Sequence, residues 1–490
     1  MKSKSLALLT DLYQLTMAYG YWKHGKADQQ SVFHLFFRSN PFRGGYVIAA
    51  GLQTALEFVQ SFRFSPDDVQ FLATLPGNDG QPIFEPAFLE YLSRLELNVE
   101  VDAIPEGTVV FPHEPMLRIR GSILQCQLLE TALLNILNFQ SLIATKASRI
   151  AMAAQGDSVL EFGLRRAQGI DGALSASRAA FIGGCAATSN VLAGKLYGIP
   201  VRGTHAHSWV MSFDTELESF SAYAEAMPNN CVFLVDTYDT LEGVRQAILV
   251  GQHLKVSGHR MVGIRLDSGD LAWLSIEARK LLDAAGFKDS VIVASNDLDE
   301  RLIQSLKLQG ATIGVWGVGT KLITAFDQPA LGGVYKLGAI QSATGDWLPK
   351  IKLSEQIIKT STPGMLQVRR FFDGDGNSME DMIFSELGPL SLPSSIVDQS
   401  DSSITHQIPL STVFEDLLQP VIRDGKLSRE HPTLHSVRTR TMEQLQQFHS
   451  RYLRFDNPHL YPVGLEQQLH ELKSRLVLKA RFPKHADETA

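Results

Sequence analysis

The sequence is poor in cysteine and carries no excess of positive charge. Its 490 residues include three cysteines, Cys126, Cys185 and Cys231, which are widely spaced and set among apolar or small residues. An odd number of such thiols favours a reduced core and excludes a disulfide framework or a cysteine-rich zinc site. The net charge of -7 argues against a surface that coats nucleic acid, so we expect no nucleic-acid partner.

Long apolar runs are also missing. No uninterrupted apolar stretch is long enough to cross a bilayer, and the early run 6–9 is too short for a secretory signal because Thr10 and Asp11 interrupt it. We therefore expect a cytoplasmic protein without a membrane partner. The composition, 44% hydrophobic and 20% charged, is typical of two or three globular domains with a large buried core.

Short strand-like runs recur through the middle of the chain, and each ends in small, hydroxyl or acidic residues. The runs are 159–162, 200–202, 232–235, 262–266, 291–294 and 313–316. The later runs start roughly 30 residues apart, which is the length of a strand plus a crossover helix. Because parallel barrel strands place their carboxyl ends on one face, we expect the polar turns to line one pocket. The pattern predicts an α/β fold with an irregular, incomplete barrel.

The barrel is one of three regions along the chain. Residues 1–145 predict a mixed α+β, sandwich-like domain packed on an antiparallel sheet, and residues 146–340 carry the barrel. Residues 341–490 add strands that we expect to pack with the N-terminal domain, followed by terminal helices. The segment 392–405, rich in Ser and Asp, predicts a surface loop.

Local signals mark where the barrel helices begin and end. Asp239 and Asp297 each precede an acidic residue by three positions, which is the pattern of a capped helix start. Gly198, followed by Pro200, predicts a helix end.

The last strand-like run leads into a glycine-containing turn. Gly317, Gly319 and Thr320 would allow backbone amides to approach an anion without an intervening side chain. A tight turn that needs a flexible backbone explains the same residues equally well. Together with the other polar strand ends, the turn favours phosphate binding.

Two acidic clusters and a histidine pair are further candidates. The segments 267–270 and 295–297 could hold Mg²⁺ or ribose hydroxyls, or simply cap helices. His205 and His207 would face the same side of an extended chain. A metal site lacks an obvious third ligand nearby, whereas a neutral imidazole can attack phosphorus; a structural role remains open for both histidines.

Taken in order, these motifs resemble the nicotinate phosphoribosyltransferase family nearly from end to end. The matching segments are 10–17, 36–38, 161–167, 188–194, 203–208, 265–270, 454–459 and 461–465. The resemblance implies transfer of phosphoribosyl from phosphoribosyl pyrophosphate to nicotinate in NAD biosynthesis, giving nicotinate mononucleotide and pyrophosphate. It also implies coupling to ATP hydrolysis, a requirement for Mg²⁺ and a homodimer with a shared active site.

The resemblance also assigns roles to individual residues. His207 matches the phosphorylated histidine, whereas His205 occupies a variable position. Phe162 matches the aromatic residue that stacks on nicotinate, and Tyr13 from the second subunit would cover the other face of the ring. Asp267 would position ribose or magnesium-bound pyrophosphate and steady the positive charge that grows on the sugar.

Further substrate contacts follow from the same motifs. Arg265 would bind a carboxylate or phosphate, Arg165 would meet phosphate, and Thr204 lies in a substrate-binding motif. Ser189 stands where related nicotinamide enzymes carry Asp, so we expect it to favour the acid over the amide. Arg166 is adjacent to Arg165, and the sequence leaves open which of them faces the ligand.

One departure from the family pattern limits these assignments. The segment 183–188 differs from the common family pattern, which puts the local phosphate contacts in doubt. The alternatives are a nicotinamide phosphoribosyltransferase, a sugar-phosphate barrel lyase or epimerase, and a non-catalytic nucleotide-binding protein. A Schiff-base lyase would need a lysine at a strand end, and the strand-end segments contain none.

Overall fold

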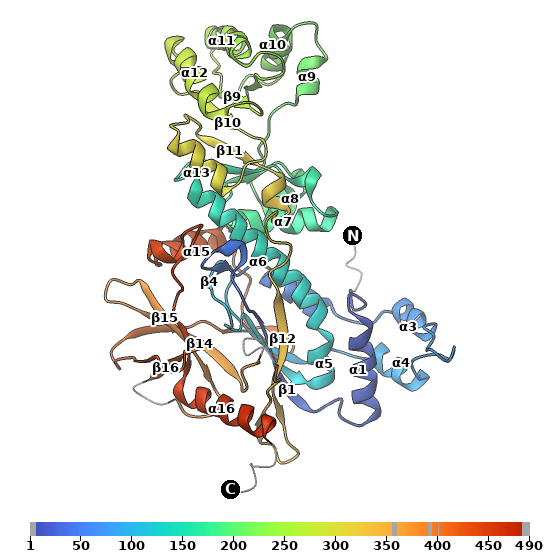
Figure 1. Cartoon of the computed structure of the whole chain (residues 1–490). Coiled ribbons are helices and arrows are strands. Elements are labelled where there is room, and N and C mark those ends of the chain that lie inside the picture. The colour runs from blue at the N-terminus through green and yellow to red at the C-terminus, as the bar shows by residue number, and fades with distance from the viewer. Residues whose placement is uncertain (1–5, 355–359, 391–393, 400, 483–490) are drawn as a thin grey trace. The chain divides into compact units, whose positions relative to one another are not determined.

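The computed structural model describes residues 6–354, 360–390, 394–399 and 401–482, which form two compact units (Figure 1). Unit 1 comprises residues 1–141, 330–433 and 439–490, and unit 2 comprises residues 142–329 and 434–438. The sequence-based boundaries at 145 and 340 lie close to two of these divisions. Residues 330–340, which we had assigned to the barrel, belong to unit 1.

An antiparallel sheet of seven strands forms the centre of unit 1. Its spatial order is β13 (Trp347–Pro349), β12 (Gly333–Gln341), β1 (Gln30–Phe37), β5 (Leu117–Ser122), β3 (Val99–Ala103), β19 (Gln419–Arg423) and β20 (Lys426–Leu427). β1 pairs with β12 on one side and β5 on the other, so segments 300 residues apart in sequence are neighbours. A separate two-stranded sheet pairs β2 (Val47–Ile48) with β4 (Val109–Val110).

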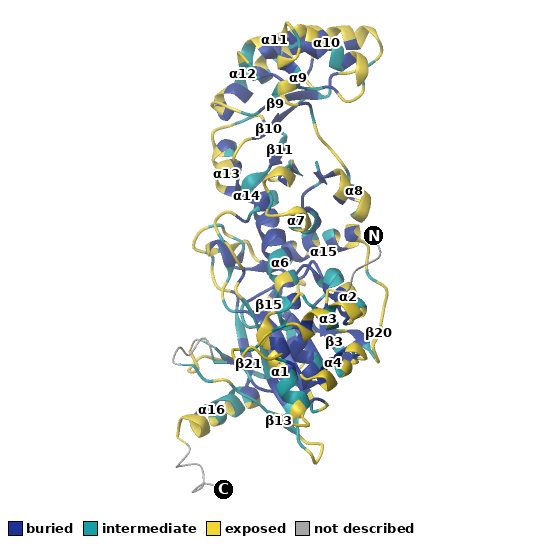
Figure 2. Ribbon diagram, turned by 90° about the vertical axis from the view of Figure 1, so that its right-hand side faces the viewer, coloured by how far each residue is buried: buried dark blue, intermediate teal, exposed yellow. Residues whose placement is uncertain are grey.

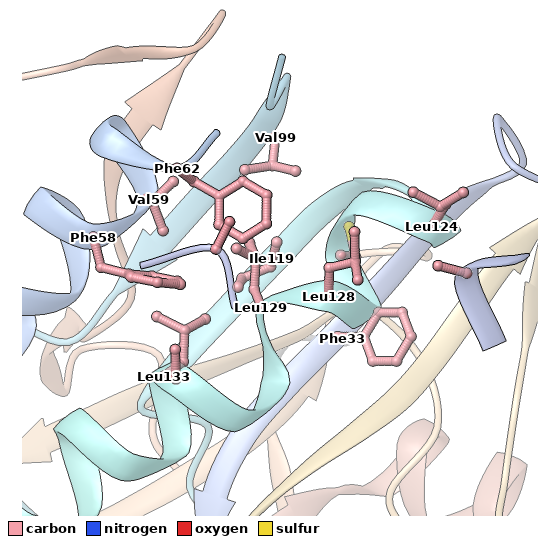
Figure 3. Close-up of a cluster of buried hydrophobic side chains, with 14 of the residues drawn as sticks. Phe33, Phe58, Val59, Phe62, Val99, Ile119, Leu124, Leu128, Leu129 and Leu133 are labelled. Carbon is pink, nitrogen blue, oxygen red and sulfur yellow. The ribbon is translucent and has the colours of Figure 1, made fainter. Parts of the chain in front are cut away.

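Helices cover one face of this sheet and enclose the core of unit 1. Figure 3 shows Phe33 of β1, Val99 of β3 and Ile119 of β5 beside Leu128 and Leu133 of the helices. The helices are α1 (Leu12–Lys23), α2 (Leu52–Ser61), α3 (Pro66–Ala73), α4 (Pro86–Ser93), α5 (Ile123–Leu128) and α6 (Glu130–Ala153), which continues into unit 2. This arrangement confirms a mixed α+β domain built on an antiparallel sheet.

A second sheet in unit 1 is formed by C-terminal strands. Its order is β17 (Thr405–Gln407), β16 (Ser395–Asp398), β21 (Val463–Glu466), β15 (Ser378–Ser385), β14 (Leu366–Phe372) and β18 (Val413–Asp416). The helices α15 (Leu434–Gln446) and α16 (Gln467–Arg481) complete this region. The surface loop predicted over 392–405 is wrong for β16, because Ile396 and Val397 are buried in the sheet. Residues 392, 393 and 400 of that prediction lie outside the described residues.

Unit 2 is built on a sheet of six parallel strands. Their spatial order is β7 (Ala187–Thr188), β6 (Ser158–Glu161), β11 (Val315–Val318), β10 (Val291–Ala294), β9 (Gly263–Leu266) and β8 (Val232–Leu234). The predicted run 200–202 forms only an isolated bridge, between Val201 and Thr188. The strand β7 was not predicted, because two residues are too short to show a hydrophobic pattern.

The parallel strands follow one another as in a barrel that is cut open. β8, β9, β10, β11, β6 and β7 are neighbours in that order, and Val201 adds a bridge beyond β7. Among the described residues, β8 pairs with β9 only and no strand links it to Val201, so the ring does not close. This confirms the irregular, incomplete barrel expected from the sequence.

Helices connect and cover the parallel strands. They are α7 (Ile170–Ile182), α8 (Val191–Tyr197), α9 (His207–Met211), α10 (Glu216–Ala226), α11 (Thr240–Val256), α12 (Leu271–Ala284), α13 (Glu300–Leu308) and α14 (Thr320–Ile323). In Figure 2 the strands β9 and β10 are mostly buried, whereas α10, α11 and α12 show exposed faces. The sheet is therefore the core of unit 2, and its strand ends are the places where loops can meet.

The predicted helix signals are correct in two of three cases. Asp239 caps α11 by accepting a hydrogen bond from Glu242 N, and Gly198 ends α8 with a left-handed backbone. Asp297 is not an N-cap; α13 starts three residues later, and Asp299 accepts the bond from Leu302 N. The described part of the chain contains no helix long and apolar enough to span a membrane. The three cysteines are buried and free, as the composition predicts.

Candidate functional site

A pocket of about 340 Å³ lies at the carboxyl ends of the parallel strands in unit 2. Its lining residues come from the ends of β9 and β11 and from the turns after β6, β7, Val201, β9, β10 and β11. They are Phe162, Arg165, Arg166, Ser189, Gly203, Thr204, Arg265, Asp267, Ser295, Asn296, Asp297, Gly317, Gly319 and Thr320. Residues as far apart in sequence as Phe162 and Thr320 therefore share one cavity. Both adjacent arginines line it, so the structure does not single out one of them.

The pocket wall beside Phe162 depends on a glycine. Gly317 lies inside β11 and not after it, which shifts the predicted end of this strand by two residues. A Cβ atom on Gly317 would lie 2.7 Å from Phe162 Cδ2 and 2.8 Å from Cε2. Phe162 N also donates to Val318 O at 2.8 Å. Gly317 thus makes room for the aromatic ring, while Gly319 and Thr320 form the turn at the start of α14.

Arg265 supplies a partly buried cation to the pocket. It lies on β9, and its Nη1 donates to Thr204 Oγ1. Its Nε is buried and has no hydrogen-bond partner among the described residues. Burial lowers the pKa of the Arg265 guanidinium, although the neighbouring Asp267 and Asp236 oppose the shift. Arginine remains charged despite such a shift, so the pocket presents a fixed positive group.

Asp267 is held by residues from the adjacent strands. Ser295 Oγ donates to Asp267 Oδ1, and Asp267 N donates to Asp236 Oδ2 at 2.8 Å. Ser268 Oγ donates to the same Asp236 oxygen at 2.7 Å. Asp270, the second acid of the cluster, faces away from this chemistry and caps α12 through Trp273 N. The helix cap predicted for the cluster is therefore found at Asp270, whereas Asp267 lines the pocket.

His207 lies at the first position of α9 beside two carboxylates. Its Nδ1 is 3.1 Å from Thr237 Oγ1, and its Nε2 is 3.7 Å from Asp267 Oδ2 and 4.0 Å from Asp236 Oδ1. The His207 side chain is 38% exposed, whereas that of Asp236 is 1% exposed. The imidazole is thus fixed by one nitrogen and still reachable from solvent, as a group that accepts a phosphoryl group must be.

His205 has a different environment from His207. Leu234 N of β8 donates to His205 Nε2 at 3.3 Å. The centroid of the His205 ring lies 4.8 Å from that of the Tyr223 ring. Burial lowers the pKa of His205 to about 4, so the imidazole is neutral near pH 7. The ring therefore links the segment after Val201 to β8, across the gap where the barrel remains open.

A buried polar network supports the pocket below Phe162. Glu161, 1% exposed at the end of β6, accepts from Ser177 Oγ at 2.9 Å, from Thr188 Oγ1 at 2.6 Å and from Gly163 N. Asn190 N donates to Thr188 Oγ1 at 2.9 Å, which fixes the turn that carries Ser189. A carboxylate that accepts several bonds inside a protein holds the attached chain in one arrangement.

Of the predicted site residues, the pocket gathers nine: Phe162, Arg165, Ser189, Thr204, Arg265, Asp267, Gly317, Gly319 and Thr320. His207 contacts one of them, Asp267. Tyr13 lies on α1 in unit 1, where its side chain is 48% exposed, and it is not among the lining residues. Asp236 was not predicted as a site residue. In the sequence it is only the acid that follows a strand-like run, and its position beside His207 becomes evident only in the folded chain.

No protein-only metal site is present in the described part of the chain: no group of three or more His, Cys, Asp or Glu side chains there could hold an ion. Asp267 Oδ2 and the exposed Asp297 still offer oxygen ligands at the pocket. Mg²⁺ commonly binds through one or two carboxylates, substrate phosphates and water. The fold and the pocket thus define an α/β protein with a polar, arginine-containing pocket at the carboxyl ends of its parallel strands, the usual place for ligands in such sheets.

Comparison with known proteins narrows this class. Models of the nicotinate phosphoribosyltransferase N-terminal domain, family and C-terminal domain match residues 8–138, 158–373 and 366–473. The nicotinate phosphoribosyltransferase of Bacillus subtilis is 43% identical over 496 residues, 97% of each chain, and that of Homo sapiens is 36% identical over 96% of each. The crystal structure of human nicotinic acid phosphoribosyltransferase aligns with a TM-score of 0.84 at 34% identity, over 95% of this chain and 99% of that one. The chain belongs to the nicotinate phosphoribosyltransferase family.

Proposed function

We propose that this protein transfers the phosphoribosyl group of phosphoribosyl pyrophosphate to nicotinate in NAD biosynthesis. The pyridine nitrogen attacks the anomeric carbon, the bond from that carbon to pyrophosphate breaks, and nicotinate mononucleotide and pyrophosphate leave. The observation that supports this proposal best is the convergence of an aromatic ring, three arginines and a carboxylate in one pocket of a family member.

The pocket residues suit the two substrates. The Phe162 ring, fixed over Gly317, offers a flat surface for the pyridine ring and leaves its nitrogen free to react. Arg265 and Arg165 can bind a carboxylate or phosphate through their planar forks. Asp267 lies where a fixed negative charge would stabilise the oxocarbenium-like sugar as pyrophosphate departs. Ser189 can donate a hydrogen bond to a carboxylate, which favours the acid over the amide.

We propose that ATP drives the reaction through His207. With Nδ1 held by Thr237, Nε2 is the ring nitrogen left to attack the γ-phosphorus; the bond to the β-phosphate oxygen breaks and ADP leaves. Water later hydrolyses the phosphohistidine and releases phosphate. Coupling follows only if the phosphorylated and free enzymes bind substrates with different affinities. Asp267 and Asp297 would hold Mg²⁺, which neutralises phosphate charge when it is bound.

We further propose a homodimer in which Tyr13 of the second subunit covers the pyridine ring. The family resemblance and the half-exposed Tyr13 side chain support this arrangement. It explains why an aromatic residue of a matching motif is absent from the pocket of a single chain. Sedimentation should give a dimer, and Tyr13→Ala should raise the KM for nicotinate without lowering the unfolding temperature.

A product assay tests the transfer reaction. The protein is incubated with phosphoribosyl pyrophosphate and nicotinate, nicotinamide or quinolinate, with and without ATP, and the mononucleotides are separated. We expect nicotinate mononucleotide, more of it with ATP. If nicotinamide were the one substrate that gave a mononucleotide, the protein would be a nicotinamide phosphoribosyltransferase. The lack of any lysine among the residues that line the pocket argues against a Schiff-base lyase.

A variant of the histidine tests the coupling separately. His207→Ala should lose acid-labile phosphate after incubation with radiolabelled ATP, and ATP should no longer stimulate product formation. His205→Ala is the control, because His205 is buried, packs on Tyr223 and accepts a hydrogen bond from Leu234 N. Retention of both phosphorylation and stimulation in His207→Ala would contradict the assignment.

A further inference from the structure

An ion pair directly behind the pocket joins two of its turns. Lys321 comes directly after the pocket turn 317–320, and Asp299 comes two residues after the pocket turn 295–297. Lys321 Nζ lies 2.6 Å from Asp299 Oδ2, and their side chains are 28% and 11% exposed. A contact at this position fixes the separation of the two turns that face the ligand.

Both carboxylate oxygens of Asp299 are engaged. Oδ1 accepts from Leu302 N at 2.8 Å and caps α13, while Oδ2 accepts from Lys321. Burial would raise the pKa of the Asp299 carboxyl, yet the bonds from Lys321 and Leu302 hold it below the usual value. The pair is therefore charged near neutral pH, and it ties the start of α13 to α14.

The same helix start is anchored on its other side. Glu300, 2% exposed, binds Arg149 Nε at 2.8 Å and Lys146 Nζ at 2.7 Å, both on α6. These partners are themselves almost completely buried, with side chains 1% and 0% exposed. The first turn of α13 is thus held between α6 and Lys321, which leaves the preceding loop little freedom.

That loop contains a strained residue. Asn296 lines the pocket with φ of 106°, a backbone conformation that favours glycine. Such a backbone conformation is strained and persists only where the surrounding structure holds it in place. The anchored start of α13, three residues further on, supplies that restraint.

We propose that Lys321 and Asp299 are positioning residues that keep the turns 295–297 and 317–320 at the separation that phosphoribosyl pyrophosphate requires. This inference rests on the proposed function, because it concerns binding of the phosphoribosyl donor. The ion pair does not touch the ligand. It acts through Asn296 and Thr320, whose backbone it fixes.

The test compares Lys321→Met with a matched ion-pair control. Lys307→Met removes a similar ion pair in unit 2. Lys307 Nζ lies 2.7 Å from Asp157 Oδ2, and the two side chains are 20% and 24% exposed. Neither residue lines the pocket. Because Lys321→Met frees two turns that are otherwise held in place for the donor, we expect it to weaken the affinity for phosphoribosyl pyrophosphate about tenfold, in calorimetric Kd and in KM. The kcat should remain within about twofold, Lys321→Arg should restore the affinity, and Lys307→Met should bind like the wild type.

The readouts separate this inference from the proposed function. Calorimetric affinity for phosphoribosyl pyrophosphate does not require turnover, so it tests the ion pair even if the wild type forms no nicotinate mononucleotide. Wild-type affinity in Lys321→Met, or an equal loss in Lys307→Met, would overturn the inference. A wild type that binds no phosphoribosyl pyrophosphate would overturn both proposals.

Discussion

Replacing Gly317 by alanine should displace the Phe162 ring from the pocket wall. The new Cβ would lie 2.7 Å from Cδ2 and 2.8 Å from Cε2, whereas ordinary contact begins at 3.4 Å. The ring must therefore retreat by about 0.7 Å, because repulsion rises steeply below contact distance. The backbone has little room to move instead, since Gly317 is buried in β11 between β6 and β10.

Overpacking of this kind costs about 1–3 kcal/mol. Every 1.4 kcal/mol is about a tenfold change in affinity, so the KM for nicotinate should rise about tenfold to a hundredfold. Steady-state kinetics with varied nicotinate measure this effect, and thermal unfolding shows how much of the cost falls on stability. Gly314→Ala is the control, because a Cβ there would meet no atom within 4 Å. Gly317→Ala with wild-type KM and wild-type unfolding temperature would refute the packing argument.

Three further predictions concern specificity, stability and pH. Ser189→Asp should raise the preference for nicotinamide over nicotinate at least about tenfold in kcat/KM, because an added carboxylate repels the acid; an unchanged ratio would count against it. Glu161→Gln places an amide against three hydrogen-bond donors and should lower the free energy of unfolding by about 1–3 kcal/mol in urea titrations. Burial lowers the pKa of His205 to about 4 and that of His34 to about 3, below the value near 6.5 of the unfolded chain. As the pH falls, the histidines of the unfolded state therefore take up protons before those of the folded state, and the free energy of unfolding should fall between pH 6.5 and pH 4. Urea unfolding at pH 7 and pH 5 should show this loss of stability. The loss should be smaller in His205→Gln, which lacks one of the two groups.

Local patterns in the sequence were sufficient for most of the barrel. The strands β6, β8, β9 and β10 lie within one residue of the predicted runs, because each is an apolar segment with a polar turn after it. The helix signals at Asp239 and Gly198 are correct for the same reason: both depend on neighbouring residues only. The convergence of the strand ends followed from the parallel arrangement that these signals imply.

Features that depend on long-range contacts could not be predicted. The strand β7 is defined by its pairing with β6, and the pairings of β1 with β12 and β3 with β19 join distant segments. The cap at Asp299 was assigned to Asp297 because Asp297 has an acid three residues later and Asp299 does not; only the contacts of Asp299 with Lys321 and Leu302 identify the true cap. The adjacency of β8 and β9 likewise brings Asp236 to Asp267, and the place of Asp236 beside His207 depends on the contact of α9 with the turn after β8.

The most direct test of this account is a crystal structure of the protein with nicotinate mononucleotide bound. We predict that the pyridine ring will lie on Phe162, with its carboxylate near Ser189 and the 5′-phosphate at the turn formed by Gly319 and Thr320. The ribose should lie within reach of Asp267, with His207 behind it. A product bound away from these strand ends would contradict the account.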